Sequence, residues 1–289
     1  MRTPVLDLAN LPWSPTAIKH AIFDIDGTLT DEHSVTSEAT IAALRALDDA
    51  GVPITLATGR LLNGGANLVR RAGIYAWVIA AGGGVVWNGK DIVAAHYMDT
   101  DLVDQITDFA HDHDLVPFYF DESEMYTDRA AMAATGMLQV NENASEGKPI
   151  LDLAQFDPTR TTKISFAAAN AEEIDAVLEP IRARFPGAVR SHANFLDIPA
   201  TGTTKWEGIE RALGVRGLRA EDALGVGDSE NDVAWLGHVG YPVAAPISDP
   251  AVLETCKWRL PQVDDAVAKL IRAELARKAG SQGAPDAKD

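Results

Sequence analysis

The sequence is poor in several residues whose presence defines whole classes of protein. Cys256 is the only cysteine among 289 residues, so neither a disulfide within one chain nor a metal site made of several cysteines can form. This usage is typical of a reducing compartment, and we expect a cytoplasmic protein. No histidine that would activate the thiol stands beside it, so we expect Cys256 to be a buried packing residue.

Positive charge is scarce as well. The chain has 25 Lys and Arg against 42 Asp and Glu, a formal net charge of −17 and a pI near 4.7. Such a surface repels nucleic acid and anionic membranes, so we expect neither as a partner. No segment has the uninterrupted apolar length of a membrane span. Residues 1–15, with Asp7 and three prolines, also lack the apolar run of a signal peptide. Nothing in the composition indicates an oligomeric state.

What the chain does contain is an alternation of apolar strands and amphipathic helices. After an irregular lead-in over residues 1–19, strands are predicted in "KHAIFD", "VPITLATG" and "YAWVIAAGGGVVW", with helices between them. The pattern resumes with "NFLDIPA", "ALGVGDS" and "GYPVAA" and ends with a long helix in "VDDAVAKLIRAELARK". Nearly continuous apolar strands of this kind predict an α/β fold, with a Rossmann-like parallel sheet covered on both faces.

The middle of the chain has a different texture. Residues 88–192 hold their own helices and strands and a polar stretch, which indicates an inserted α+β domain. We therefore predict a core formed by residues 1–87 and 193–289, with an inserted domain over residues 88–192. The tail, residues 279–289, has a composition typical of disorder.

Four polar loops follow strands of the predicted core. The first begins with Asp24 and Asp26, the second with Thr58 and Gly59, the third leads to Lys205, and the fourth carries Asp228, Asn231 and Asp232. In an open parallel sheet the carboxyl ends of the strands share one edge, where ligands bind. We therefore expect all four loops to line one cleft.

The residue types in these loops indicate phosphate chemistry. Carboxylates without His or Cys favour a hard cation such as Mg²⁺. With the cation bound, Thr58, Lys205 and amides of the turn at Gly27 can bind phosphate oxygens. Asp24 is then the candidate nucleophile that forms an aspartyl-phosphate. Asp26, two residues later, can protonate the leaving alcohol and activate water.

Together "FDIDGTLT", "TLATGR", "TGTTKWEGI" and "GVGDSENDVAWL" resemble the haloacid dehalogenase (HAD) superfamily of phosphohydrolases. The long insertion between the threonine and lysine motifs resembles the Cof-type subgroup, which has a C2 (IIB) cap. The resemblance implies that Mg²⁺ is held by the Asp24 side chain, the Asp26 carbonyl and Asp228. It implies that Asp232 supports the metal indirectly and that Asn231 lies near the phosphate. The chain departs from the family pattern at residues 82–84 and 245–246, which leaves the chemistry unchanged.

We expect a Mg²⁺-dependent phosphatase whose cap selects a small phosphorylated metabolite, such as a sugar phosphate. Tyr119, Asp121, Glu122 and Arg129 follow a strand of the cap and are candidate specificity residues, although a surface loop explains them equally well. One alternative is a phosphomutase on the same scaffold. Another is a non-catalytic binding module, against which the retained aspartates and lysine argue.

Overall fold

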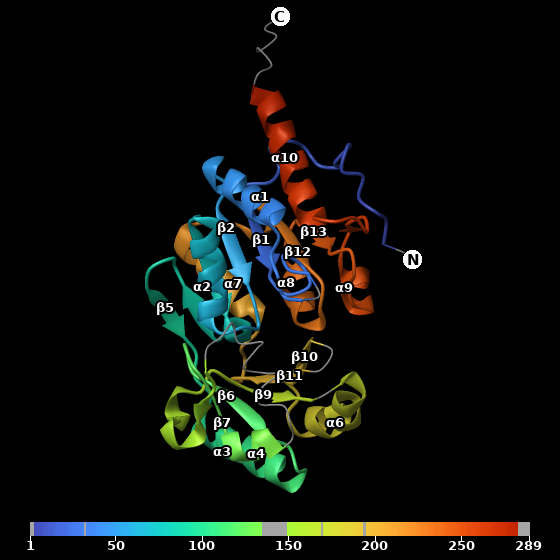
Figure 1. The fold of residues 1–289 in the computed structure, drawn as a ribbon. Helices are drawn as coiled ribbons and strands as arrows, with labels where there is room; N and C mark the ends of the chain where they lie inside the picture. Colours follow the sequence, from blue (N-terminus) through green and yellow to red (C-terminus); the bar gives the residue numbers. More distant parts are fainter. Residues whose placement is uncertain (1–2, 32, 135–148, 169, 193–194, 283–289) are drawn as a thin grey trace, which may run out of the picture. The chain divides into compact units, whose positions relative to one another are not determined.

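The structure is a computed structural model, and it describes residues 3–31, 33–134, 149–168, 170–192 and 195–282. Within these residues, no helix combines the length and the apolar character that crossing a membrane requires. The chain forms an α/β fold with a mostly parallel sheet and a separate mixed sheet inserted in mid-chain (Figure 1). This confirms the fold class predicted from the sequence.

The first sheet has eight strands in the order β14-β13-β12-β1-β2-β3-β4-β5. Its strands are β1 (His20–Asp24), β2 (Ile54–Ala57), β3 (Ala76–Ala80), β4 (Val85–Trp87), β5 (Ile92–Ala95), β12 (Ala223–Gly227), β13 (Tyr241–Ala244) and β14 (Trp258–Arg259). The pairs β1–β12, β12–β13 and β13–β14 are parallel, whereas β3–β4 and β4–β5 are antiparallel. Every residue of β1, β2, β3 and β12 is buried, which explains their continuous apolar sequences.

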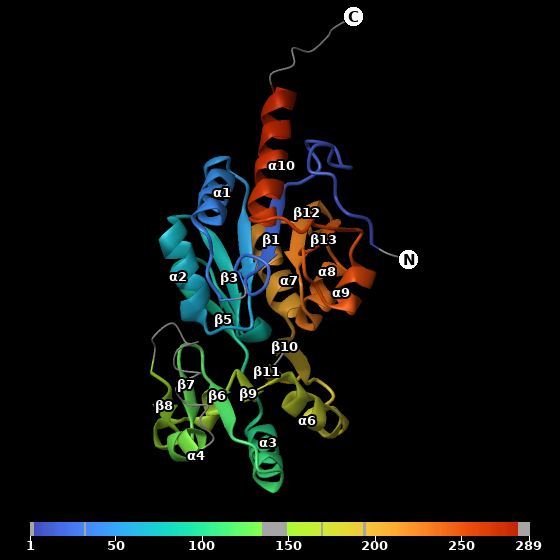
Figure 2. The ribbon, with the colours of Figure 1, turned by 45° about the vertical axis from the view of Figure 1, so that its right-hand side comes forward.

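Six helices accompany these strands: α1 (Glu38–Asp49), α2 (Leu62–Ala72), α7 (Lys205–Arg216), α8 (Val233–Leu236), α9 (Pro250–Thr255) and α10 (Ala266–Gln282). The start of α1 is set by Ser37, whose side chain accepts a hydrogen bond from the Thr40 amide. The buried stripe of α1 contains Ile41, Leu44 and Leu47. In both ribbon views α1 and α10 lie side by side (Figure 1, Figure 2).

The second sheet has six strands in the order β10-β11-β9-β6-β7-β8. They are β6 (Pro117–Phe120), β7 (Met125–Thr127), β8 (Leu151–Asp152), β9 (Lys163–Ala167), β10 (Val189–His192) and β11 (Phe195–Pro199), and the helices of this region are α3 (Thr100–Asp112), α4 (Arg129–Ala134) and α6 (Ala171–Arg184). The prediction that "NFLDIPA" resumes the core sheet is wrong, because β11 pairs antiparallel with β9 and β10.

Side chains alternate between the two faces of this second sheet. Ile164 and Phe166 of β9, with Leu196 and Ile198 of β11, belong to the apolar cluster that also holds buried residues of α3 and α6. Both helices lie on one face of the sheet (Figure 2). The alternate residues of the two strands, which include Lys163, therefore point to the opposite face.

The chain divides into two compact units. One contains residues 1–56, 68–77 and 210–289, and the other contains residues 57–67 and 78–209. The domain boundaries expected at residues 88 and 192 stay a prediction. The helix α10 runs to Gln282, so residues 279–282 are helical and not part of the expected disordered tail. Residues 283–289 lie outside the described part of the chain.

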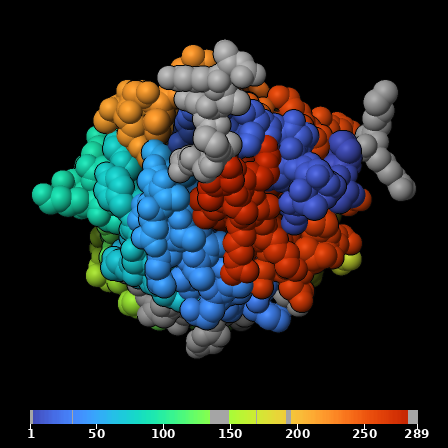
Figure 3. All heavy atoms as spheres, turned by 90° about the horizontal axis from the view of Figure 1, so that it is seen from above, coloured from blue at the N-terminus to red at the C-terminus, as the bar shows by residue number. Residues whose placement is uncertain are grey.

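The lead-in, residues 3–19, packs against α10 in the first unit. The Trp13 indole nitrogen donates to Glu274 at 2.9 Å, and its ring lies 5.5 Å from Tyr241 and 5.2 Å from Trp258. Lys278 donates to the Ile18 carbonyl at 2.5 Å. Figure 3 shows the lead-in in dark blue against the red helix. The segment is irregular as predicted, but its tryptophan is part of the core.

Candidate active site

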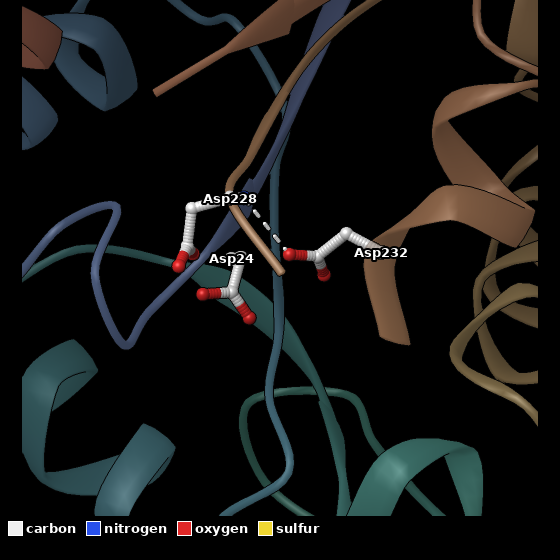
Figure 4. Close-up of side chains that lie close together, drawn as sticks. All are labelled: Asp24, Asp228 and Asp232. Atoms are coloured by element: carbon white, nitrogen blue, oxygen red, sulfur yellow. Dashed lines mark hydrogen bonds between the residues drawn. The ribbon is translucent and has the colours of Figure 1, made fainter. Parts of the chain in front are cut away.

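Two parallel strands of the first unit place Asp24 and Asp228 at the same edge. Asp24 is the last residue of β1, and Asp228 directly follows β12. The two strands pair in register, with Phe23 opposite Val226. Figure 4 shows the carboxylates of Asp24 and Asp228 close together. Asp24 is only 2% exposed, so its carboxylate has lost most of its hydration.

Asp232 joins this pair from the short turn Glu230–Asp232 that leads into α8. One of its carboxylate oxygens accepts from the Asp228 amide at 3.0 Å and from the Ser229 amide at 3.2 Å. The other accepts from the Trp235 indole at 2.9 Å. Asp232 is fully buried, and Figure 4 draws its bond to Asp228 as a dashed line. Its contacts therefore fix the loop that carries Asp228.

The turn after β1 brings a second contact to Asp228. The amides of Leu29 and Thr30 donate to the Ile25 carbonyl at 2.9 and 3.0 Å, which closes the turn. At its tip Gly27 has φ +75°, and a Cβ there would lie 2.4 Å from a carboxylate oxygen of Asp228. The hydroxyl of Thr28 donates to the other oxygen at 3.0 Å. Only a glycine allows this close approach of the two loops.

Asp24, Asp228 and Asp232 form an all-oxygen group that can bind a divalent metal. Each offers a carboxylate oxygen, and these atoms lie within 4.8 Å of one another. Unit negative charges so close repel each other by roughly 3 to 4 kcal/mol per pair at an effective dielectric constant of about 20. A hard divalent cation removes this repulsion, and carboxylates are its preferred ligands. Among the described residues, no other group of His, Cys, Asp and Glu is arranged to hold a metal ion.

The threonine motif lies in the second unit. Thr58 directly follows β2 and is fully buried, and its amide donates to the Ile79 carbonyl at 2.8 Å. The Thr58 hydroxyl oxygen accepts from the Arg60 amide at 3.0 Å. The carbonyl of Thr58 accepts from the Gly82 amide at 3.1 Å. Backbone contacts from the end of β3 thus hold this loop.

The same glycine turn reaches the lysine motif. Gly83 has φ +112°, and a Cβ there would lie 2.0 Å from the Thr204 carbonyl oxygen. Lys205 is the first residue of α7, as predicted, and its side chain is buried. The Thr204 amide donates to Glu207 at 2.8 Å, and Trp206 donates to the Thr204 hydroxyl at 3.2 Å, so Thr204 caps the helix. Within this unit the turn at Gly83 thus connects the two expected phosphate-binding loops.

Comparison with known proteins agrees with these motifs. The model of the haloacid dehalogenase-like hydrolase family matches residues 21–271. The chain belongs to this family. It is a HAD phosphatase of the Cof-like type, and so a phosphoric monoester hydrolase.

This HAD phosphatase is similar to several named proteins and solved structures. It is 23% identical over 258 residues to the 5-amino-6-(5-phospho-D-ribitylamino)uracil phosphatase YcsE of Bacillus subtilis, with 88% of this chain and 95% of the relative covered. It is 26% identical to a phosphoglycolate phosphatase of Methanothermobacter thermautotrophicus, with 81% and 88% covered. A sugar phosphatase of HAD subclass IIB superposes with a TM-score of 0.72 at 22% identity, covering 88% of this chain and 98% of the other. At this identity the superposition shows the fold.

The candidate specificity residues of the cap have internal partners in this HAD phosphatase. The Tyr119 hydroxyl lies 2.9 Å from that of Thr107, and the residue is 2% exposed. Asp121 accepts from Tyr126 at 2.7 Å and from two amides of its own turn. Arg129 donates to the Ile150 carbonyl. Their roles toward substrate stay predictions.

Sequence reasoning did not connect Tyr97 or Arg160 with the predicted residue Glu122, although both contact it. Glu122 accepts from Tyr97 and, at 2.7 Å, from Arg160. The hydrogen bond to Glu122 raises the pKa of Tyr97 above its ordinary value. Neither residue lies near Glu122 in the sequence, so no local pattern indicates the contact.

The single cysteine is inert, as its sequence context predicts. Cys256 is 7% exposed, and burial, with a smaller contribution from the charge of Asp232, raises the pKa of its thiol to about 12. The thiol is therefore protonated at neutral pH and unsuited to nucleophilic attack.

Proposed function

We propose that the protein is a Mg²⁺-dependent phosphatase that hydrolyses a small phosphorylated metabolite, such as a sugar phosphate, through an aspartyl-phosphate. The observation that carries this proposal is the cluster of Asp24 and Asp228, at the ends of two parallel strands, with Asp232 from the turn that follows the second strand. Its donor set fits Mg²⁺, since all the ligand atoms are oxygens. When bound, Mg²⁺ would neutralise charge on the phosphate, with Asp24 and Asp228 as side-chain ligands and Asp26 as a carbonyl ligand.

In the proposed reaction a carboxylate oxygen of Asp24 attacks phosphorus and the bond from phosphorus to the ester oxygen breaks. Asp26 gives its proton to the leaving alcohol. Asp26 then takes a proton from a water molecule, which attacks phosphorus and releases inorganic phosphate and the Asp24 carboxylate. Asp26 is half-buried and lies two residues after the nucleophile, in the turn closed on Ile25, which suits a group that exchanges protons with water.

Thr58, Gly59, Lys205 and Asn231 are the proposed phosphate-binding residues. A hydroxyl and an ammonium group donate to phosphate oxygens and hold the phosphorus for attack. Within the second unit, the contacts of Gly82 and Gly83 connect the Thr58 loop to the residue before Lys205, which supports a shared role. In the first unit Asn231 accepts from the Ser229 hydroxyl at 3.0 Å, in the loop that carries Asp228.

The small size of the substrate is part of the proposal. The B. subtilis and M. thermautotrophicus relatives are phosphatases of small phosphorylated molecules, as their names state. An inserted domain that restricts access to the site favours such substrates. The relatives act on different compounds, so the substrate itself has to be measured.

The test is phosphate release from a panel of small phosphate esters with Mg²⁺ or with EDTA, for wild type and Asp24→Asn. We expect metal-dependent release that the variant reduces by about a thousandfold or more, because the nucleophile is lost. Product analysis with a sugar monophosphate separates hydrolysis from phosphoryl transfer to a second hydroxyl. A variant that keeps a tenth of the wild-type rate would overturn the role of Asp24.

A further inference from the structure

A buried ion pair lies on the face of the second sheet opposite α3 and α6. The Lys163 ammonium donates to a carboxylate oxygen of Asp197 at 2.8 Å, and the Ser165 hydroxyl donates to the other oxygen at 2.6 Å. Lys163 and Asp197 are each 4% exposed, and Ser165 is fully buried. Burying two charges in a sheet gives little net stability, so the presence of this ion pair has a reason other than stability.

The remaining contacts of Lys163 indicate that reason. Its ammonium also donates to the carbonyl of Gly59 at 2.8 Å and lies 4.4 Å from the centroid of the Phe120 ring. Gly59 directly follows Thr58, the proposed phosphate-binding residue. Lys163 therefore joins β9 and β11 of the second sheet, called the cap sheet below, to the loop of Thr58, Gly59 and Arg60, called the threonine loop. All of these residues belong to one compact unit.

Three successive carbonyls of the threonine loop each accept a hydrogen bond. The Thr58 carbonyl accepts from the Gly82 amide at 3.1 Å, and the Arg60 carbonyl accepts from the Ala81 amide at 2.8 Å. The carbonyl between them, that of Gly59, accepts from Lys163. The backbone thus holds the first and the last, and a side chain from the cap sheet holds the middle one.

Because the peptide bond is planar, the contact of Lys163 with the Gly59 carbonyl also affects the orientation of the Thr58 hydroxyl. In a trans peptide the C=O and the following N–H point in opposite directions. Fixing the Gly59 carbonyl on Lys163 therefore fixes the direction of the Arg60 N–H, which donates to the Thr58 hydroxyl oxygen at 3.0 Å. A hydroxyl that accepts in this way keeps its own hydrogen for another acceptor.

We propose that Lys163, held by Asp197, is a positioning residue that orients the Thr58 hydroxyl to donate to the substrate phosphate. The proposal rests on the proposed function, in which Thr58 binds that phosphate. Lys163 acts through the peptide between Gly59 and Arg60 and needs no contact with the substrate.

A double-mutant cycle tests whether Lys163 acts through Thr58. The variant Lys163→Met/Asp197→Leu, called the apolar pair below, replaces the ion pair by apolar side chains, a change that proteins often tolerate. It is made both in the wild-type protein and in the Thr58→Val variant. We expect kcat/KM for the best ester to fall about tenfold or more when Thr58 is present, and less than about twofold in Thr58→Val. The Ki of inorganic phosphate should follow the same pattern. An equal loss in both backgrounds would mean that the pair only supports the fold.

Two further variants keep the result interpretable. Lys257→Met is the matched control, because the exposed Lys257 donates to the Gly240 carbonyl at 2.9 Å in the other unit, and it should leave kcat/KM within about twofold. Should the apolar pair not fold, Asp197→Asn enters the same cycle, since it leaves the Lys163 ammonium without its counter-charge. The same loss with and without the Thr58 hydroxyl would again overturn the proposal.

Amide hydrogen exchange separates this proposal from the proposed function. The Arg60 amide should exchange at least about tenfold faster in the apolar pair than in wild type, whether or not the protein turns over an ester. Unchanged exchange would show that Lys163 does not fix this peptide and would overturn the proposal. If Thr58→Val has full activity while Arg60 exchange still rises, the phosphate-binding role of Thr58 fails instead.

Discussion

Replacing Asp232 should affect both the stability and the metal dependence of the protein. Its carboxylate accepts three hydrogen bonds, from the amides of Asp228 and Ser229 and from the Trp235 indole, and it is fully buried. Asp232→Ala leaves the buried Trp235 indole and two part-buried amides without their acceptor. At about 1 to 3 kcal/mol for the buried donor and less for the two part-buried ones, we expect a loss of about 2 to 4 kcal/mol in the free energy of unfolding, measured with saturating Mg²⁺ so that the cation offsets the repulsion among the three carboxylates.

The same change should weaken Mg²⁺ activation. The Asp232 carboxylate fixes the amide of Asp228, so its loss frees the loop that places the Asp228 carboxylate beside Asp24. Removing a group that orients a metal ligand costs about 10- to 100-fold in metal affinity. We therefore expect the Mg²⁺ concentration for half-maximal phosphate release to rise at least about tenfold, measured at a temperature where the variant is folded.

Asp249→Asn is the matched control for this experiment. Asp249 accepts from the amide of Glu230 at 2.9 Å in the same loop, but it is exposed and lies outside the carboxylate cluster. It should lower stability by less than about 1 kcal/mol and leave the Mg²⁺ midpoint unchanged. Urea unfolding gives the free energies. An Asp232→Ala variant with the stability and the Mg²⁺ midpoint of wild type would refute the role given to these hydrogen bonds.

Three further predictions follow from the first unit. Asp228→Ala should abolish most Mg²⁺ activation with little loss of stability, and unchanged metal dependence in a Mg²⁺ titration would place the metal elsewhere. Trp13→Ala should lower the free energy of unfolding by about 3 to 5 kcal/mol, because it removes a buried ring and its bond to Glu274; a loss below about 1 kcal/mol in urea would show that the lead-in is dispensable. Cys256 should resist iodoacetamide until the protein unfolds. Folding raises the pKa of the Cys256 thiol from 9.0 to about 12. The protonated thiol therefore contributes its full stability below pH 9, and this contribution is lost as the pH rises toward 12. Cys256→Ala should remove this pH dependence.

The loops that carry Asp24 and Asp228 could be predicted, because the signals for them are local in the sequence. A buried apolar strand followed by Asp24, and another followed by Asp228, predict carboxylates at one edge of a parallel sheet, and the described residues place them together. The start of α7 at Lys205 was also predictable, since Thr204 and Glu207 form a capping pair at the spacing that begins helices.

The cap was harder to predict because its contacts are distant in sequence. The strand β11 has the apolar composition of a core strand, and only its pairing with β9 shows that it belongs to the second sheet. The partner that makes a buried Asp197 tolerable, Lys163, lies 34 residues earlier. The sequence around Trp13 has no helix or strand periodicity, so it did not predict the contact of Trp13 with Glu274 in α10.

The central claim is that Asp24 becomes phosphorylated, and trapping that species tests it most directly. In Asp26→Asn the water that hydrolyses the intermediate loses its base, whereas an activated ester such as p-nitrophenyl phosphate needs no acid to leave. Acid quenching followed by peptide mass spectrometry should therefore find one phosphoryl group on Asp24 in the presence of Mg²⁺, and none in Asp24→Asn/Asp26→Asn. Release of p-nitrophenol with the phosphoryl group on another residue, or at the same rate without Asp24, would contradict the account.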